Sequence, residues 1–170
     1  EASKSVIDNS SIFYITGFFL TVSCEAIDII GKECVAKNKT LCMNLSAPFL
    51  IQFFGDQMTA AMPYVDIMFG NETEAQTMGE KMGWGNDIAA IAKGIASLPK
   101  ASGMRCRTVV ITQGSTSTFV VANGVVTEYP VVPLDAKDLV DTNGAGDAFV
   151  GGFLAQLAQG APMAKCVDAG

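Results

Sequence analysis

The sequence contains no histidine and only five cysteines, and these shortages limit the sites that it can form. Zinc sites are built from His and from closely spaced Cys, and no two cysteines stand in a Cys-x-x-Cys arrangement. The cysteines are Cys24, Cys34, Cys42, Cys106 and Cys166. Their odd number and wide spacing favour reduced, mostly buried thiols over a disulfide framework. We therefore expect no zinc site, and an intracellular protein of the cytoplasm or the nucleus.

Long apolar runs and basic clusters are also missing. No apolar run reaches the roughly 20 residues that span a bilayer, and the N-terminus carries no signal-peptide pattern. The 11 Lys and Arg are outnumbered by 17 Asp and Glu, which gives a formal net charge of −6. Nucleic-acid binding needs clustered Lys and Arg to replace phosphate counterions. We expect neither a membrane nor a nucleic acid as partner, whereas a small nucleotide held by local backbone donors is compatible with this charge.

The sequence does contain enough apolar residues, 49% of 170, for one folded domain. Strand-like runs at 12–15, 40–45, 65–69 and 108–112 alternate with helical patterns. Two further expected strands, 118–122 and 125–131, flank Asn123-Gly124, which is a strong hairpin signal. This alternation predicts an α/β fold with a mostly parallel, Rossmann-like sheet, helices on both faces and a β-hairpin near 118–131.

Helix signals stand between the expected strands. Ser23 can cap one helix, Pro48 can open a second, and Asn71 can open a third. The chain begins with Glu1 rather than Met, and its last residues still follow a helical pattern. We therefore expect residues 1–170 to be one catalytic α/β domain, or most of one, from a longer chain.

The most informative segment is Asp141-Thr142-Asn143-Gly144-Ala145-Gly146-Asp147, which leads into an apolar helix. Gly144 and Gly146 leave the backbone uncovered, so that N–H groups at a helix N-terminus can surround an anion. A carboxylate there would repel a phosphate that is merely bound, but it could accept a proton from a hydroxyl that attacks phosphorus. The alternative is a plain glycine turn, with Asp147 as an ordinary acid of the first helical turn.

Residues 141–147 resemble the DTxGAGD signature of the ribokinase (PfkB) superfamily, and residues 148–153 (Ala-Phe-Val-Gly-Gly-Phe) resemble its usual continuation. Asn143, together with the segments 44–49 (Asn-Leu-Ser-Ala-Pro-Phe) and 69–75 (Phe-Gly-Asn-Glu-Thr-Glu-Ala), resembles the eukaryotic adenosine kinase branch rather than the sugar kinases. The resemblance extends through nearly the whole chain. It implies a ribokinase-like fold and a monomeric enzyme whose partners are adenosine and ATP, with Mg²⁺ as cofactor.

The resemblance also assigns roles to residues. In that family the aspartate matching Asp147 is the general base, and the amides matching Gly144, Ala145 and Gly146 form the anion hole for the transferring phosphoryl group. The same segment places Thr142 and Asn143 at the bound nucleotide.

Asn71 and Glu74 match the family's NxxE motif, which organises Mg²⁺, water and phosphate. The resemblance implies that Glu74 acts on Mg²⁺ through water and that Asn71 lies at the nucleotide. Asn followed three residues later by Glu is also a helix capping box, and nothing local separates the two interpretations. Both could hold at once.

Three further residues and two aromatics complete the expected site. Thr112-Gln113-Gly114 follows a buried strand at the edge where open α/β sheets bind ligands, and it resembles the family's turn under ATP. A plain loop is the alternative. Phe18 and Phe49 resemble aromatics that pack around the nucleoside base, although aromatic residues more often belong to a core.

The sequence also departs from the family. This chain lacks four features of the family: the first signature, the lid domain, the acidic residue that binds the ribose hydroxyls, and the C-terminal segment. Ala136 stands where animal relatives often have a nucleoside-contacting Gln. The 170 residues alone should therefore be inactive. Another ribokinase-like sugar or nucleoside kinase, or a truncated non-catalytic subunit, remains an alternative. A dinucleotide-binding oxidoreductase does not fit, because the glycine turn lacks GxGxxG spacing.

Overall fold

The computed structural model describes residues 2–135, 137 and 141–170, and its strands form one six-stranded sheet in the order β1-β2-β3-β4-β5-β6. The strands are β1 (Ile12–Ile15), β2 (Thr40–Asn44), β3 (Ile67–Asn71), β4 (Thr108–Thr112), β5 (Ser117–Ala122) and β6 (Val125–Pro130). β1 to β4 are parallel, and β5 and β6 add an antiparallel hairpin at one edge. This confirms the α/β fold with a mostly parallel sheet and a hairpin.

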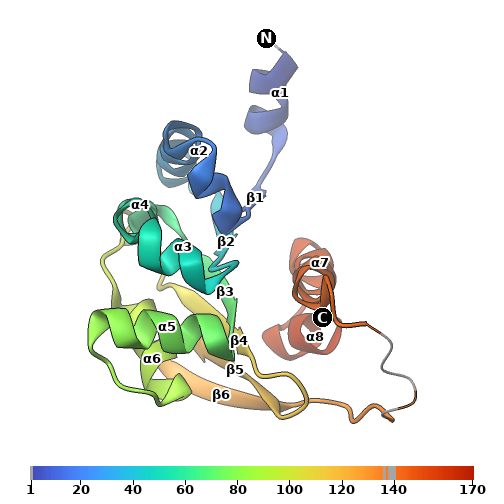
Figure 1. Cartoon of the computed structure of the whole chain (residues 1–170). Coiled ribbons are helices and arrows are strands. Elements are labelled where there is room, and N and C mark those ends of the chain that lie inside the picture. The colour runs from blue at the N-terminus through green and yellow to red at the C-terminus, as the bar shows by residue number, and fades with distance from the viewer. Residues whose placement is uncertain (1, 136, 138–140) are drawn as a thin grey trace.

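The helices form two layers of unequal size. They are α1 (Ala2–Asn9), α2 (Cys24–Ala36), α3 (Pro48–Phe53), α4 (Gly55–Ala61), α5 (Glu72–Met82), α6 (Ile88–Ser97), α7 (Ala145–Ala158) and α8 (Met163–Asp168), with the 3₁₀ turns η1 (Gly17–Thr21) and η2 (Met62–Tyr64). Successive parallel strands step in one direction across the sheet, so right-handed crossovers put all their connecting helices on the same face. Figure 1 shows α2 to α6 on that face, with α7 and α8 on the other.

The parallel strands are apolar on both sides because both faces are covered. In β2, Leu41 and Met43 pack under the α2–α6 layer, whereas Cys42 between them belongs to the cluster under α7. In β4, Val109 and Val110 divide in the same way. Successive side chains of a strand point to opposite faces of the sheet, so one run of apolar residues contributes to the core on each face.

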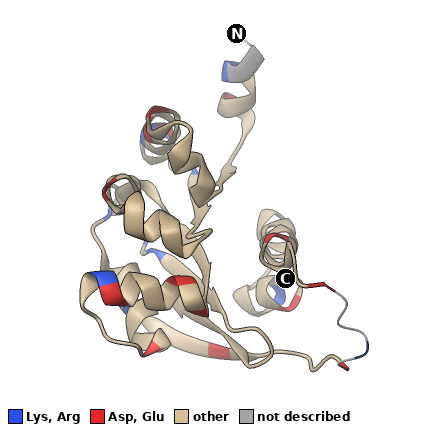
Figure 2. Cartoon of the chain, viewed as in Figure 1, with Lys and Arg blue, Asp and Glu red and all other residues tan. Residues whose placement is uncertain are grey.

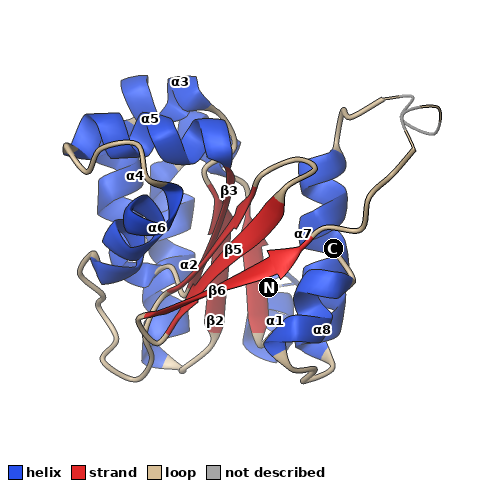
Figure 3. Cartoon of the chain, turned by 90° about the horizontal axis from the view of Figure 1, so that it is seen from below, coloured by secondary structure: helices blue, strands red, loops and turns tan. Residues whose placement is uncertain are grey.

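The expected capping signals operate in the structure. The Ser23 hydroxyl accepts the backbone N–H of Ala26 at 3.1 Å at the start of α2, and Pro48 is at the first turn of α3. Asn123 and Gly124 have φ angles of 50° and 77°, as a tight turn between β5 and β6 requires. Figure 3, which looks onto this hairpin, shows β6 at the sheet edge.

One expected strand was placed two residues too early. Residues 65–69 were expected to form it, but β3 is Ile67–Asn71. Asp66 lies just before the strand, where its carboxylate accepts the N–H of Leu41 at 3.0 Å and pairs with Lys100 at 2.5 Å. Both partners are distant in sequence, so no local pattern could have shown the shift.

A buried arginine joins the helical layer to the sheet. The Arg107 side chain is only 1% exposed, and its guanidinium donates to the carbonyl oxygens of Met62, Val65, Ile95, Leu98 and Pro99. Burial lowers the pKa of Arg107 to about 10. Because the whole donor set of this charge is satisfied by backbone, it fixes η2 and the end of α6 relative to β4.

The cysteines of the described residues are all free thiols, and Cys34, Cys42 and Cys166 are buried. Within the part of the chain that the structure covers, no helix is long and apolar enough to cross a membrane.

Candidate functional site

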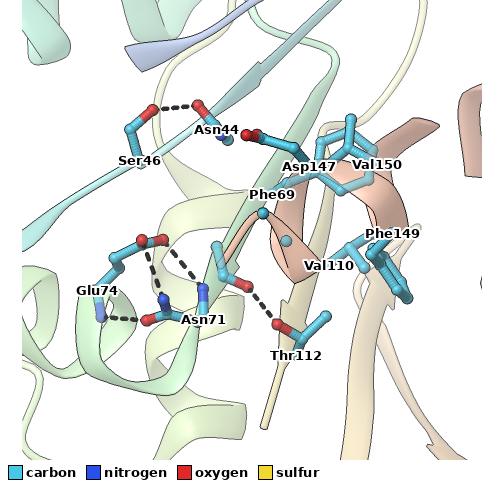
Figure 4. A pocket seen from close by; sticks show the side chains of 13 residues that line it. Asn44, Ser46, Phe69, Asn71, Glu74, Val110, Thr112, Asp147, Phe149 and Val150 are labelled. Atoms are coloured by element: carbon cyan, nitrogen blue, oxygen red, sulfur yellow. Dashed lines mark hydrogen bonds between the residues drawn. The ribbon is translucent and has the colours of Figure 1, made fainter. Parts of the chain in front are cut away.

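A pocket of about 220 Å³ lies where the carboxyl ends of β2, β3 and β4 face the first turn of α7 (Figure 4). It is lined by Asn44, Ser46, Phe69, Gly70, Asn71, Glu74, Val110, Thr112, Gly144, Gly146, Asp147, Phe149 and Val150. Open α/β sheets bind ligands at this edge because strand ends and helix N-termini converge there. The pocket brings together residues from the two separate motifs, around 71 and around 144.

The glycine turn leaves backbone donors available at the start of α7. Gly144 has a φ of 76°, a left-handed conformation that glycine adopts without strain, and the helix begins at the next residue. Among the described residues, the N–H groups of Gly144, Gly146 and Asp147 have no hydrogen-bond partner. The N–H of Ala145, in contrast, donates to the carbonyl oxygen of Thr142 at 3.1 Å. Two glycine amides therefore remain free for an anion, while the Ala145 amide would have to exchange its partner.

The carboxylate of Asp147 is exposed and points into the pocket (Figure 4). Among the described residues it takes part in no ion pair, and no hydrogen bond joins it to another side chain drawn at the pocket. It is thus not a structural salt link. An unpaired carboxylate beside free amides can accept a proton from a bound hydroxyl.

Asn71 and Glu74 form a complete capping box on the opposite wall of the pocket (Figure 4). The Asn71 side-chain oxygen accepts the N–H of Glu74 at 2.9 Å, and the Glu74 carboxylate accepts the backbone N–H of Asn71 at 3.0 Å. The Asn71 amide also donates to the other Glu74 oxygen at 3.1 Å. The capping interpretation is therefore correct, and the pocket position of both residues leaves the metal interpretation open as well.

Glu74 is a buried carboxylate, 6% exposed, with no cation beside it among the described side chains. Burial raises the pKa of Glu74, the backbone hydrogen bond from Asn71 partly opposes this, and the nearby Glu72 adds to the rise. A buried acid that faces a pocket without a positive partner is a favourable position for a bound cation.

The pocket lining includes two carboxylates, Glu74 and Asp147, but neither Lys nor Arg. Figure 2 shows the described Lys and Arg dispersed over the molecule rather than gathered at this edge. Within the described chain, no group of three or more Cys, Asp or Glu could hold a metal by itself. These residues fit Mg²⁺, which usually keeps most of its waters and takes one or two carboxylates together with substrate phosphates.

Several expected site residues lie outside this lining. Thr112 lines the pocket, but Gln113 and Gly114 form the turn to β5, where the Gln113 side chain donates to the Ser117 carbonyl oxygen at 3.1 Å. Thr142 and Asn143 precede the glycine turn and are exposed. The Asn143 N–H donates to the Asp141 carboxylate at 2.9 Å, which shapes the approach to α7. Ala136 lies outside the described residues.

Phe18 and Phe49 contact each other rather than the core. Their ring centroids are 5.7 Å apart with planes at 58°, and the side chains are 49% and 40% exposed. Phe18 is on η1, directly after β1, and Phe49 is on α3, directly after β2, so both follow strands whose ends approach the pocket. Aromatic rings this exposed at a ligand-binding edge are available to stack on a flat ligand.

Sequence reasoning assigned no role to Asn44 and Ser46, which also line the pocket. The Asn44 side-chain oxygen accepts the N–H of Gly17 at 2.8 Å and is bonded by the Ser46 hydroxyl. Ser46 has a φ of 65°, which is uncommon for a residue with a side chain. The available signal was a polar residue at the end of an apolar strand, the same signal that indicated Thr112.

Comparison with known proteins identifies relatives along the whole chain. The family model described as pfkB family carbohydrate kinase matches residues 1–170. The chain is 50% identical to adenosine kinase 1 of Arabidopsis thaliana over 167 residues, which are 98% of this chain and 48% of that protein. It is 45% identical to adenosine kinase of Dictyostelium discoideum over 170 residues, which are 100% of this chain and 50% of that protein.

A solved structure shows the same fold at high similarity. Anopheles gambiae adenosine kinase in complex with P1,P4-di(adenosine-5) tetraphosphate superposes with a TM-score of 0.96 and 44% identity, over 99% of this chain and 50% of that one. The chain thus spans about half the length of the relatives that it matches.

Proposed function

Because this chain belongs to the pfkB family of carbohydrate kinases, we propose that it forms the phosphoryl-transfer part of an adenosine kinase. The complete protein would transfer the γ-phosphoryl group of ATP to the 5′-hydroxyl of adenosine and release AMP and ADP. The relatives named adenosine kinase, at 45% and 50% identity along the chain, support this acceptor over a sugar. We further propose that residues 1–170 are part of one catalytic domain.

One observation carries the proposal: an unpaired carboxylate, Asp147, stands next to unpartnered glycine amides at the N-terminus of α7, and all of them line one pocket. Asp147 would accept the proton of the 5′-hydroxyl as that oxygen attacks the γ-phosphorus. The amides of Gly144 and Gly146 would donate to the phosphoryl oxygens, where negative charge must be held during transfer. The Ala145 amide would join them after leaving the Thr142 carbonyl oxygen.

The opposite wall would position the charged end of ATP. Bound Mg²⁺ would offset the negative charge of the phosphates, which the lining itself does not do. Glu74 would face it through water, and Asn71 fixes the Glu74 carboxylate by its two hydrogen bonds. Thr112 lines the same pocket, and we propose that Gln113, Gly114, Thr142 and Asn143 lie along the nucleotide outside it.

The aromatic pair supports a nucleoside acceptor. We propose that Phe18 and Phe49 contact the adenine ring, because they are exposed and lie beside the ends of β1 and β2. The Anopheles protein binds a molecule in which two adenosines are joined through phosphates. A site that takes ATP and adenosine together would have to accommodate those same groups.

The test is turnover of the complete protein with Mg·ATP and, in turn, adenosine, inosine and ribose. We expect adenosine to give the highest kcat/KM and Asp147→Asn to lower kcat by about 10²–10⁴-fold, the usual contribution of a general base. The exposed position of Asp147 predicts an unchanged fold in that variant, checked by circular dichroism. Normal kcat in Asp147→Asn would refute the mechanism, and a preference for ribose or inosine would refute the acceptor.

The isolated 170-residue chain provides a second test. We expect it to phosphorylate no adenosine even when folded, because it spans only about half of the related kinases. Adenosine phosphorylation by this piece would show that these residues already contain the whole site.

A further inference from the structure

Tyr14, on β1, has a polar group that the proposed mechanism does not use. Its ring packs edge-on against Phe69, with centroids 6.4 Å apart and planes at 81°. Its hydroxyl is buried and has no hydrogen-bond partner among the described residues. A buried hydroxyl without a partner is unfavourable, which points to a nearby acceptor that it can reach in another state of the site.

The fold directs Tyr14 toward the helix that carries Asp147. Along β1, Phe13 and Ile15 pack with the α2–α6 layer, whereas Tyr14 packs with the cluster that contains Val150 and Phe153 of α7. Asp147 and Val150 are three residues apart and so lie on the same side of α7. Phe69, which contacts Tyr14, lines the pocket together with Asp147.

Electrostatics agrees with this placement. Burial and the negative charge of Asp147 raise the pKa of Tyr14 to about 12, with smaller effects from Cys42 and Glu74. These three are the ionisable groups that influence the phenol from α7, β2 and α5. The phenol therefore stays protonated at neutral pH and is a donor, while the Asp147 carboxylate is an acceptor without a described partner.

We propose that Tyr14 is a positioning residue for Asp147, donating a hydrogen bond from its hydroxyl to the carboxylate when substrates occupy the pocket. The bond selects one orientation of an otherwise exposed side chain, so that the other carboxylate oxygen faces the attacking hydroxyl. A misplacement of a reacting group by about 1 Å can lower the rate by about 10²-fold. This inference rests on the proposed function, in which Asp147 is the base.

The test variant is Tyr14→Phe in the complete protein, since it removes the hydroxyl and keeps the ring against Phe69. We expect kcat to fall by about ten- to hundred-fold, the effect of losing a hydrogen bond to a charged group. The KM values for adenosine and ATP should stay within about twofold, because Tyr14 is not among the residues that line the pocket. Tyr129→Phe is the matched control: Tyr129 packs against the same cluster from β6, and its kcat should not change.

A pH profile separates positioning from structure. The hydrogen bond favours the ionised carboxylate, so its loss should move the acid limb of kcat/KM to higher pH in Tyr14→Phe and leave it in place in Tyr129→Phe. The two mutations should also be non-additive: in an Asp147→Asn background, Tyr14→Phe should lower the residual turnover no further. Full additivity, or an unmoved acid limb with unchanged kcat, would overturn the inference.

An independent measurement needs no change at Tyr14. Asp147→Asn removes the charge beside the phenol, so one tyrosine should titrate at lower pH in the ultraviolet absorbance of the complete protein. An unchanged tyrosine titration would overturn the proposed contact even if Tyr14→Phe failed to fold. Full turnover in Asp147→Asn would overturn the proposed function and this inference together, whereas full turnover in Tyr14→Phe alone would overturn only the inference.

Discussion

Glu74 accepts hydrogen bonds from both nitrogen atoms of Asn71, and Asn71 in return caps the helix on which Glu74 stands. The pair therefore has a structural role that is complete without any ligand. It also presents a buried carboxylate to the pocket. A role of this carboxylate in binding Mg²⁺ would therefore be measurable separately from its role in capping the helix.

Replacing Glu74 with Gln should separate the two roles. One hydrogen bond from Asn71 loses its acceptor, which costs about 1 kcal/mol of stability, while the negative charge is removed entirely. We expect the Mg²⁺ concentration for half-maximal turnover to rise by about tenfold or more in the complete protein. Glu80→Gln, an exposed change on the same helix, should alter neither the stability nor the Mg²⁺ dependence. Unchanged Mg²⁺ dependence in Glu74→Gln would leave the pair as a helix cap only.

The same variant has a defined pH dependence of stability. The pKa of Glu74 is raised in the folded protein, so the folded state resists ionisation more than the unfolded state does. The wild-type protein must therefore lose stability as the pH rises from the ordinary Glu value of 4.5 through the folded pKa. Gln does not ionise, so Glu74→Gln has no such loss. The Tm of Glu74→Gln minus that of the wild type should therefore increase as the pH rises from about 4.5 to neutrality. A constant difference in Tm would contradict a raised pKa.

Phe49→Ala should weaken adenosine binding. Stacking of a base on an aromatic ring contributes about 1–3 kcal/mol, so the KM for adenosine should rise about tenfold or more with little change in the KM for ATP. Because the Phe49 side chain is 40% exposed, the Tm of Phe49→Ala should differ little from that of the wild type. Phe53→Ala is the control, since Phe53 is on the same helix α3, is 77% exposed and lies outside the pair. Equal effects of the two substitutions would argue against a specific contact.

Arg107→Met should be among the most damaging single changes outside the pocket. It removes five hydrogen bonds from the guanidinium to carbonyl oxygens, three of them buried and two partly buried, and we expect a loss of about 3 kcal/mol or more in the free energy of unfolding. Urea denaturation followed by circular dichroism measures it. Lys32→Met, at a lysine that is exposed on α2, should change the free energy by less than about 0.5 kcal/mol.

Two adjacent glycines of α7 should respond in opposite directions. A Cβ on Gly152 would lie 1.9 Å from the carbonyl oxygen of Ala169, so Gly152→Ala must push α8 away and lower the Tm. A Cβ on Gly151 would meet no atom within 4 Å, and Ala is the better helix former by about 0.8–1.0 kcal/mol. Gly151→Ala should therefore raise the Tm. An unchanged or raised Tm in Gly152→Ala would contradict the close contact of α7 with α8.

The sequence predicted those parts of the fold that depend on neighbouring residues. Ser23, Pro48, Asn71 and the Asn123-Gly124 turn carry local signals, and each operates where it was expected. The shift of β3 depends on Asp66 meeting Lys100, 34 residues away, and such a contact leaves no trace in a local pattern.

The candidate site could likewise be predicted only where its residues carry local sequence signals. The motifs around Asn71 and Asp147 were visible as polar or glycine-rich residues at strand and helix ends, and the structure brings them to one pocket. The parts that sequence reasoning did not reach are Asn44 and Tyr14. Asn44 acts through a hydrogen bond to Gly17, and Tyr14 faces α7 only because β1 joins the sheet in one register. Both depend on tertiary packing rather than on spacing.

The order of the two helical layers has a consequence for synthesis. Among the described residues, all six strands and the helices of one face precede α7 and α8, which cover the opposite face. A nascent chain that ends before residue 145 therefore exposes Cys42, Phe69, Val110 and Val120 to water. It also lacks the helix that bears the glycine amides and Asp147, so the same segment of chain completes the proposed phosphate site and covers this apolar surface.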